Sequence, residues 1–266
     1  MSTAALENLI AKKFISRKDV KAVQKTNGDY RPVDSPWSRT DLGDHLAGRK
    51  TFGHYMLSTE GTCKLIAFDI DIEQRTDRNP IGWLPTDDDL SEFEECSPRD
   101  VWADRSKKNQ RAYLKIELKS AAHLLVRAVE DLLSVPVAAA YSGGKGVHVY
   151  AFTGPVSGSD ARDGAEIVLE SLSDFKLYRG KNFFRVSQPG PGVLFSNLSV
   201  EIYPKQAAIE ADGGYGNLMR LPLGRNLKSQ DPTFFMDMTS PMGQMKPLDP
   251  MIALSDNYSP WVSVGD

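Results

Sequence analysis

The chain has 266 residues, of which 41% are hydrophobic and 25% are charged, the composition of an ordinary globular protein with a sizeable core. Its formal net charge of -3 excludes a surface that is basic throughout, so any nucleic acid must bind to a local basic surface. No run of about 18 apolar residues occurs, and the N-terminal segment lacks the apolar run of a signal peptide. We therefore expect a cytoplasmic protein without a membrane segment.

Residues 1–50 begin with an amphipathic segment and continue as a polar stretch with turn and extended-chain signals, among them Asn27-Gly28. This pattern predicts a lead-in to the main domain. The run from Leu65 to Phe68 then reads as a buried strand that ends in Asp69-Ile70-Asp71. Residues 73–107 are mostly polar, which predicts a long surface excursion without a core of its own.

Between Arg111 and Leu133 apolar residues recur at helical spacing, which predicts a helix. Strands at 135–141 and 147–152 should flank the glycine-rich turn 142–146 as a hairpin. A further helix is expected from about Asp160 to Leu172, with Ser159 or Asp160 as its N-cap, and short strands at 198–203 and 218–223. The tail after Lys228 has no clear periodicity.

Cys63 and Cys96 are the only cysteines, too few for a disulfide framework and without the paired spacing of a structural zinc site. We expect both to be ordinary reduced thiols.

Asp69 and Asp71 should point to the same side of their strand because strand side chains alternate, while Phe68 and Ile70 point into the core. The two carboxylates would lie about 6 to 7 Å apart. A divalent cation such as Mg²⁺ or Mn²⁺ would offset their repulsion. An Asp-x-Asp pair is also common at a solvated strand end, so the pair alone does not establish a metal site.

The turn from Ser142 to Gly146 contains three glycines, which let backbone N–H groups approach an anion, and Lys145 adds a positive charge. His148 follows within reach of the same ligand. A flexible hairpin followed by a structural histidine would use the same residues. The spacing does not fit the phosphate loop Gly-x-x-x-x-Gly-Lys-Ser/Thr, which disfavours a generic ATPase.

Glu201 lies within an apolar strand, where an unpaired charge is costly, so we expect it to bind a cation. The alternative is an edge-strand glutamate that faces water. Lys205, Asn217 and Arg220 add groups that could hold a triphosphate or a template backbone, or could simply belong to a charged surface.

Taken together, these segments resemble the archaeo-eukaryotic primase superfamily, especially its primase-polymerases from viruses, mobile elements and bacterial conflict systems. The likeness runs from about Gly53 to Arg225. It rests on an Asp-x-Asp motif at 68–71, a Ser-x-His type motif at 142–150, an acidic motif at 200–206 and a basic strand at 217–224. Four segments in the family's order are far more specific than any one of them.

The resemblance implies that three carboxylates hold two Mg²⁺ or Mn²⁺ ions: Asp69, Asp71 and Glu201. The residues implied to contact the nucleotide are Ser142, Gly144, Lys145, His148, Arg220 and, as weaker assignments, Lys205 and Asn217. His148 also counts among the implied catalytic residues. Many primases of this superfamily carry a zinc module of cysteines and histidines, which this sequence lacks, so no zinc is expected.

The implied fold is α/β in the α+β sense, with an N-terminal αβ unit, a C-terminal unit related to an RNA-recognition-motif sheet, and the active site between them. The catalytic domain would span residues 51–228 with a polar insertion at about 73–107. Residues 1–50 would be a lead-in segment packed on it, and residues 229–266 a C-terminal extension.

The implied function is a template-dependent DNA or RNA primase-polymerase that uses nucleoside triphosphates and a single-stranded DNA template. A helicase or a helical priming domain is an expected partner. A gap-filling repair polymerase that cannot start chains is one alternative, and a non-catalytic nucleic-acid-binding replication module is another. Tyr150 and Tyr203 are candidates for selecting the sugar of the nucleotide.

Overall fold

The computed structural model describes residues 3–72, 97–172, 177–179, 184–186, 197–209 and 214–260. In chain order the elements are α1 (Thr3–Phe14), β1 (Lys21–Gln24), β2 (Tyr30–Val33), α2 (Arg39–Leu46), β3 (Phe52–Tyr55), β4 (Thr62–Cys63), β5 (Ile66–Ile72), α4 (Pro98–Ala103), α5 (Lys108–Leu133), β6 (Val137–Tyr141), β7 (Gly146–Ala151), β8 (Val156–Ser157), α6 (Gly158–Glu170), β9 (Leu177–Arg179), β10 (Phe184–Val186), β11 (Leu198–Tyr203), β12 (Leu218–Arg220), β13 (Phe234–Phe235) and α7 (Pro250–Ala253). None of the described helices is both long enough and apolar enough to cross a membrane.

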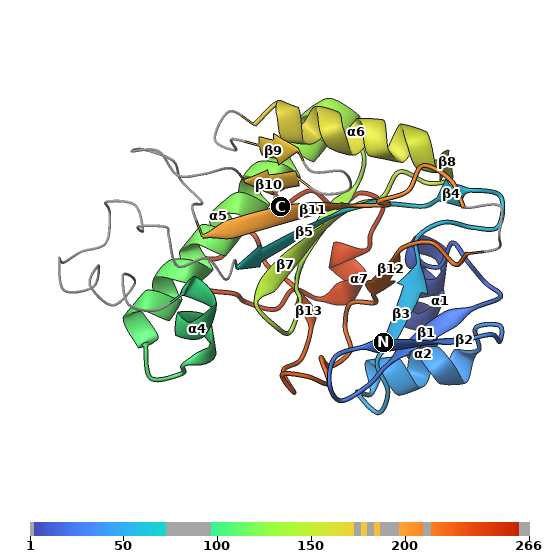
Figure 1. Cartoon of the computed structure of the whole chain (residues 1–266), viewed down its shortest axis with the longest axis horizontal. Coiled ribbons are helices and arrows are strands. Elements are labelled where there is room, and N and C mark those ends of the chain that lie inside the picture. Colours follow the sequence, from blue (N-terminus) through green and yellow to red (C-terminus); the bar gives the residue numbers. More distant parts are fainter. Residues whose placement is uncertain are drawn as a thin grey trace.

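Two antiparallel sheets form the framework of the fold. Within the described residues, seven strands make the larger sheet in the order β13-β6-β7-β5-β11-β10-β9, and four make the smaller sheet in the order β12-β3-β1-β2. Neighbouring strands in both sheets run antiparallel. Figure 1 shows helices α5 and α6 on one side of the larger sheet and the smaller sheet with α1 on the other. The expected mixture of helices and strands in an α/β fold is confirmed.

Strand β5 separates two hydrophobic cores because its side chains alternate between the faces of the sheet. Phe68 and Ile70 are fully buried in the core that includes α5 and α6. Ala67 points the other way, into a second core with Phe14 of α1 and Phe52 of β3. The face that carries Ala67 is therefore directed towards the smaller sheet, and Asp69 and Asp71 continue along that same face.

Most of the elements predicted around the motifs are confirmed. The expected helix at 111–133 is α5, the hairpin strands are β6 and β7, and the strand at 198–203 has the expected bounds in β11. The predicted N-cap of α6 at Ser159 or Asp160 is wrong. Ser157 caps that helix, because its side chain accepts a hydrogen bond from the backbone N–H of Asp160. The helix starts as soon as the short strand β8 ends.

Segments that were expected to be irregular supply ordered elements. Residues 97–107 of the polar excursion contain helix α4, which buries Val101 and Trp102 in the core beside α5. Residues 73–96 lie outside the described residues. The N-terminal 50 residues contribute strands β1 and β2 to the smaller sheet, and the tail contributes β13 to the edge of the larger one. The domain boundaries predicted at residues 50 and 228 stay predictions.

Candidate active site

Three neighbouring strands place Glu201, Asp69 and His148 in one row across the larger sheet. Asp69 of β5 is paired with Glu201 of β11 on one side and with His148 of β7 on the other. Residues paired in this way share a face of the sheet, with Cβ atoms about 4.5–5.5 Å apart. Side chains from distant parts of the sequence thus meet on the face that is directed towards the smaller sheet.

Asp71 follows Asp69 on this face, and its neighbour on β7 is Gly146. A Cβ atom at Gly146 would lie 2.3 Å from Asp71 Oδ1 and 2.3 Å from the carbonyl oxygen of Ile70. The Ile70 carbonyl oxygen belongs to the backbone of β5, so it cannot move away without disturbing the sheet. Glycine is therefore required here to leave room for the Asp71 carboxylate.

Each carboxylate of the cluster has a basic neighbour from this chain. The pairs are Asp71 Oδ2 with Lys145 Nζ (2.7 Å), Asp69 Oδ1 with His148 Nε2 (3.3 Å) and Glu201 Oε2 with Lys205 Nζ (2.7 Å). Glu201 Oε2 also accepts a hydrogen bond from the Tyr203 hydroxyl at 3.2 Å. The charges of Asp69, Asp71 and Glu201 are thus partly neutralised by basic side chains. These basic side chains could release the carboxylates and bind a ligand instead.

The two aspartates have different proton affinities. Burial raises the pKa of Asp69, but His148, Arg220 and Lys145 lower it by more, so that it ends below the usual value. Burial, followed by the charge of Asp69, raises the pKa of Asp71 to about 6 even though Lys145 opposes the shift. The charge on Asp71 is therefore under-compensated, a condition that a bound divalent cation would relieve.

The Tyr150 side chain holds the His148 ring in place. The Tyr150 hydroxyl lies 2.8 Å from His148 Nδ1, and its ring packs edge-on against Phe14 in the second core. This arrangement fits the tautomer in which Tyr150 donates to Nδ1 and Nε2–H points towards Asp69. Tyr150 is fully buried, so its hydroxyl is not available to a bound sugar. Of the two tyrosines considered for sugar selection, Tyr203 is the one that is partly exposed.

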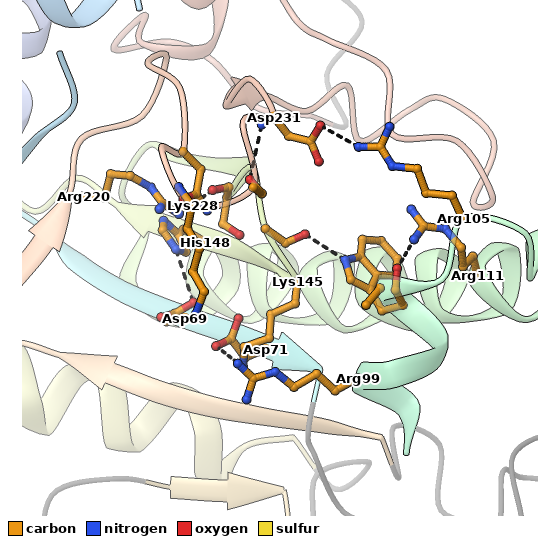
Figure 2. Close-up of a pocket in the computed structure, with 16 residues that line it drawn as sticks. Asp69, Asp71, Arg99, Arg105, Arg111, Lys145, His148, Arg220, Lys228 and Asp231 are labelled. Carbon is orange, nitrogen blue, oxygen red and sulfur yellow. Dashed lines mark hydrogen bonds and ion pairs between the residues drawn. The ribbon is translucent and has the colours of Figure 1, made fainter. Parts of the chain in front are cut away.

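A pocket of about 500 Å³ opens over Asp69 and Asp71 (Figure 2). The other predicted residues in its wall are Ser142, Gly144, Lys145, His148 and Arg220. Arg220 extends from β12 of the smaller sheet and donates a hydrogen bond to the carbonyl oxygen of Ser142 in the glycine turn. The pocket is therefore built from both sheets.

Three predicted residues do not line this pocket within the described part of the chain: Glu201, Lys205 and Asn217. Asn217 Oδ1 accepts a hydrogen bond from the backbone N–H of Lys205 at 2.8 Å, so it fixes the chain just after β11. Lys205 in turn holds Glu201. These contacts make Asn217 a support for the chain that follows β11.

The pocket also contains residues that the sequence did not single out. They are Arg99, Trp102, Ala103, Arg105 and Arg111 around α4 and α5, and Asn226, Lys228, Ser229 and Asp231 after β12. They belong to the polar excursion, the first turn of a long helix and the irregular tail. The four basic residues among them lie at positions without a recognisable motif, and the other five gave no signal in the sequence.

The donor atoms suit a hard divalent cation. In the described part of the chain, no group of three or more His, Cys, Asp or Glu side chains lies close enough to hold a metal ion as it stands. Asp69 Oδ1, however, is buried and, among the described residues, has only the 3.3 Å ion pair with His148 Nε2 as a polar contact, without a well-aligned hydrogen bond, and Asp71 lies on the same face. Carboxylate oxygens are the ligands that Mg²⁺ and Mn²⁺ prefer. To join them, Glu201 would have to separate from Lys205.

Comparison with known proteins gave one family. Residues 3–185 match the model of a family described as TOTE conflict system, Archaeo-Eukaryotic Primase domain, over more than half of the chain. The matched range includes Asp69, Asp71, Lys145 and His148, whereas Glu201 and the basic strand lie beyond it. No curated protein matches the chain.

Proposed function

Because this chain belongs to the archaeo-eukaryotic primase domain family of the TOTE conflict system, we propose that it is a template-dependent primase-polymerase. It would transfer nucleotides from nucleoside triphosphates to a 3′-hydroxyl and release pyrophosphate. Family membership supports nucleotidyl transfer in general. The dependence on a template and the use of two metal ions are what we propose beyond family membership.

The observation that carries the proposal is the row of Glu201, Asp69 and His148 beside Asp71. In this row carboxylates from neighbouring strands lie beside a histidine and the basic Lys145. All of these residues line the active-site pocket except Glu201, which is paired with Asp69 in the sheet. Nucleotidyl transfer needs these two kinds of group together: anionic ligands for divalent cations and cationic donors for a triphosphate.

Asp69, Asp71 and Glu201 would hold the metal ions. When bound, two Mg²⁺ or Mn²⁺ ions supply charge neutralisation at the attacking hydroxyl and at the departing pyrophosphate. Asp69 and Asp71 fix where the reacting phosphate lies because both are carried by the rigid central strand β5.

Lys145, His148 and Arg220 would bind the triphosphate. Lys145 and His148 now face Asp71 and Asp69, and a phosphate oxygen could replace those carboxylates as their partner. His148 Nε2–H would donate to a phosphate oxygen, with the ring held in place by Tyr150. The backbone N–H groups of the glycine turn and Ser142 add neutral donors on the same side of the pocket.

The proposal is tested by measuring nucleotide incorporation on a primed single-stranded template with Mg²⁺ or Mn²⁺. Asp69→Ala and Asp71→Ala should each lower the rate by about 10²- to 10³-fold or more, the cost of removing one preorganised electrostatic group. Asp19→Ala, at a largely exposed carboxylate, is the matched control and should incorporate at the wild-type rate. Incorporation at the wild-type rate by either active-site variant would show the assignment to be wrong.

A second assay separates a primase from a gap-filling polymerase. Incubation with unprimed single-stranded template and nucleotides should yield new short products if the chain starts synthesis. Extension of primed template alone would favour the repair polymerase. Binding of DNA without any metal-dependent incorporation would favour the non-catalytic module.

A further inference from the structure

A second hollow of about 510 Å³ lies next to the active-site pocket. The two share Trp102, Arg105, Arg111 and Asp231 in their walls, so they form one continuous depression. Figure 2 shows Arg105 and Arg111 at the end of the active-site pocket away from Asp69 and Asp71. We call the second hollow the α5 groove and define it by Arg105, Lys108, Arg111, Lys115, Tyr141 and Phe234.

The α5 groove concentrates positive charge. Lys108, Arg111 and Lys115 are three and four residues apart on α5, so they share one face of the helix over about 10 Å. Arg105 precedes them, and its ion pair with Asp231 is long, at 3.4 Å, and exposed. Among the described residues no carboxylate forms an ion pair with Lys108 or Lys115. In a chain of net charge -3, this is a local cationic surface.

The groove also offers aromatic rings. Tyr141 and Phe234 are partly exposed, with ring centroids 5.4 Å apart. The Arg111 guanidinium lies over the Trp102 ring at 4.9 Å from its centroid, and it donates a hydrogen bond to the Trp102 carbonyl oxygen. Cationic groups interleaved with aromatic rings are typical of surfaces that bind unpaired nucleic acid, where phosphates meet the cations and bases stack on the rings.

The walls of the groove are joined to the glycine turn. Trp102 Nε1–H and the Tyr141 hydroxyl both donate to the carbonyl oxygen of Gly144, each at 2.9 Å. Gly144 lies in the wall of the active-site pocket between Ser142 and Lys145. A ligand seated on Trp102 or Tyr141 is therefore one hydrogen bond away from the turn that we assign to the triphosphate.

We propose that the α5 groove holds the single-stranded DNA template as it approaches the active site. The inference rests on the proposed function, since it identifies the partner of the same pocket. In template copying, the strand that is still unpaired ahead of the site is the template, and its exposed bases can stack on Tyr141 and Phe234. An acidic peptide could use the cations but would leave these rings without a matching group.

The proposal is tested by fluorescence anisotropy with a labelled oligothymidylate. The double variant Lys108→Glu with Lys115→Glu should bind it at least about 10-fold more weakly and show a salt dependence of log Kd that is smaller by about 1.4. The charge-matched control is Lys12→Glu with Lys18→Glu. Both control lysines are exposed and lie near Lys64, at the far end of the β6–β7 hairpin from Tyr141. Control binding should stay within about 2-fold of the wild type.

A second variant tests stacking. Phe234→Leu keeps an apolar side chain but removes the ring, and it should weaken binding of the oligothymidylate about 10-fold while binding of polyglutamate stays unchanged. If Phe234→Leu binds the oligothymidylate like the wild type, the surface is a general anion patch and the template proposal is wrong. Thermal unfolding of each variant checks that the fold is retained.

The outcomes distinguish this inference from the proposed function. If the wild type incorporates nucleotides but the lysine variant binds DNA as tightly as its control, the groove is not the template site while the polymerase assignment stands. If the lysine variant and Phe234→Leu lose DNA binding but the wild type incorporates nothing, the groove binds single strands and the polymerase function is wrong.

Discussion

Glu201 and Asp69 face each other across strands β11 and β5, yet Glu201 Oε2 is bonded to Lys205 rather than directed to the aspartates. Lys205 should therefore compete with a metal ion for Glu201. We expect Lys205→Met to tighten Mn²⁺ binding several-fold in the absence of nucleotide, because it removes the ammonium that neutralises Glu201 and leaves only the Tyr203 hydroxyl bonded to it. Glu201→Gln should weaken Mn²⁺ binding about 10-fold or more. Titration of free Mn²⁺ by electron paramagnetic resonance measures both, and equal affinity in the two variants would exclude Glu201 as a ligand.

Lys145→Ala should act mainly on nucleotide binding. The ammonium lies 2.7 Å from Asp71 Oδ2 in the absence of ligand, and it is the positive side chain of the glycine turn in the pocket wall. We expect the KM for nucleotide to rise about 10- to 100-fold, the usual cost of losing a charge-assisted contact to a phosphate. Steady-state incorporation kinetics checks this. Lys25→Ala, at an exposed lysine, should behave like the wild type; an unchanged KM in Lys145→Ala would contradict the triphosphate role.

Tyr150→Phe should lower turnover without removing any group that touches substrate. The change deletes the hydroxyl that lies 2.8 Å from His148 Nδ1, so the ring loses its fixed orientation and tautomer. We expect kcat to fall about 10-fold and the unfolding free energy to fall by about 1–2 kcal/mol, as for a buried hydrogen bond. Phe152→Leu, in the same core, is the control for lost packing. A drop in stability without a drop in kcat would make Tyr150 purely structural.

The protein should lose stability in mild acid because it buries neutral histidines. Burial lowers the pKa of His45 to about 4 and that of His54 to about 3, against 6.5 in an unfolded chain. Below about pH 6.5 the unfolded state then binds more protons than the folded state. The free energy of unfolding that these histidines contribute is therefore fully present above that pH and is lost as the pH drops towards 4. Urea unfolding at pH 7.5 and pH 5 should differ by on the order of 3 kcal/mol.

His54→Leu should reduce this acid effect because it removes one titrating group from a fully buried position. The difference between the two pH values should then shrink by about half. A wild-type unfolding midpoint that stays constant from pH 7.5 to pH 5 would mean that these histidines are already protonated in the fold.

Local patterns predicted the central features of the candidate site, and long-range pairing decided the rest. The alternation of side chains along β5 was enough to predict that Asp69 and Asp71 share one face of the sheet. The helical spacing of apolar residues was enough to predict that α5 is a helix. The pairing of Glu201 with Asp69 depends on the register of two strands far apart in the sequence, which no local propensity determines. It was expected only through resemblance to a family.

The residues around α4 and the tail could not be predicted for a different reason. Trp102 and Arg111 enter the pocket because α4 folds back on α5, a tertiary contact within a segment that is polar on average. The strand β13 has two residues and the helix α7 has four, too short to show any periodicity. Their structure depends on packing against neighbouring elements, β13 on β6 and α7 on β13.

The pocket takes Asp69 and Asp71 from one sheet and Arg220 from the other, and the packing of the second core, together with the hydrogen bond from Arg220 to Ser142, holds the two sheets in register. Displacement of a reacting group by about 1 Å can cost two orders of magnitude in rate. Substitutions of buried residues in the second core, such as Met219 or Phe52, can therefore change the turnover rate while every side chain that contacts a ligand stays the same. For the polymerase that we propose, the reaction rate would then depend on core residues that touch neither nucleotide nor metal ion.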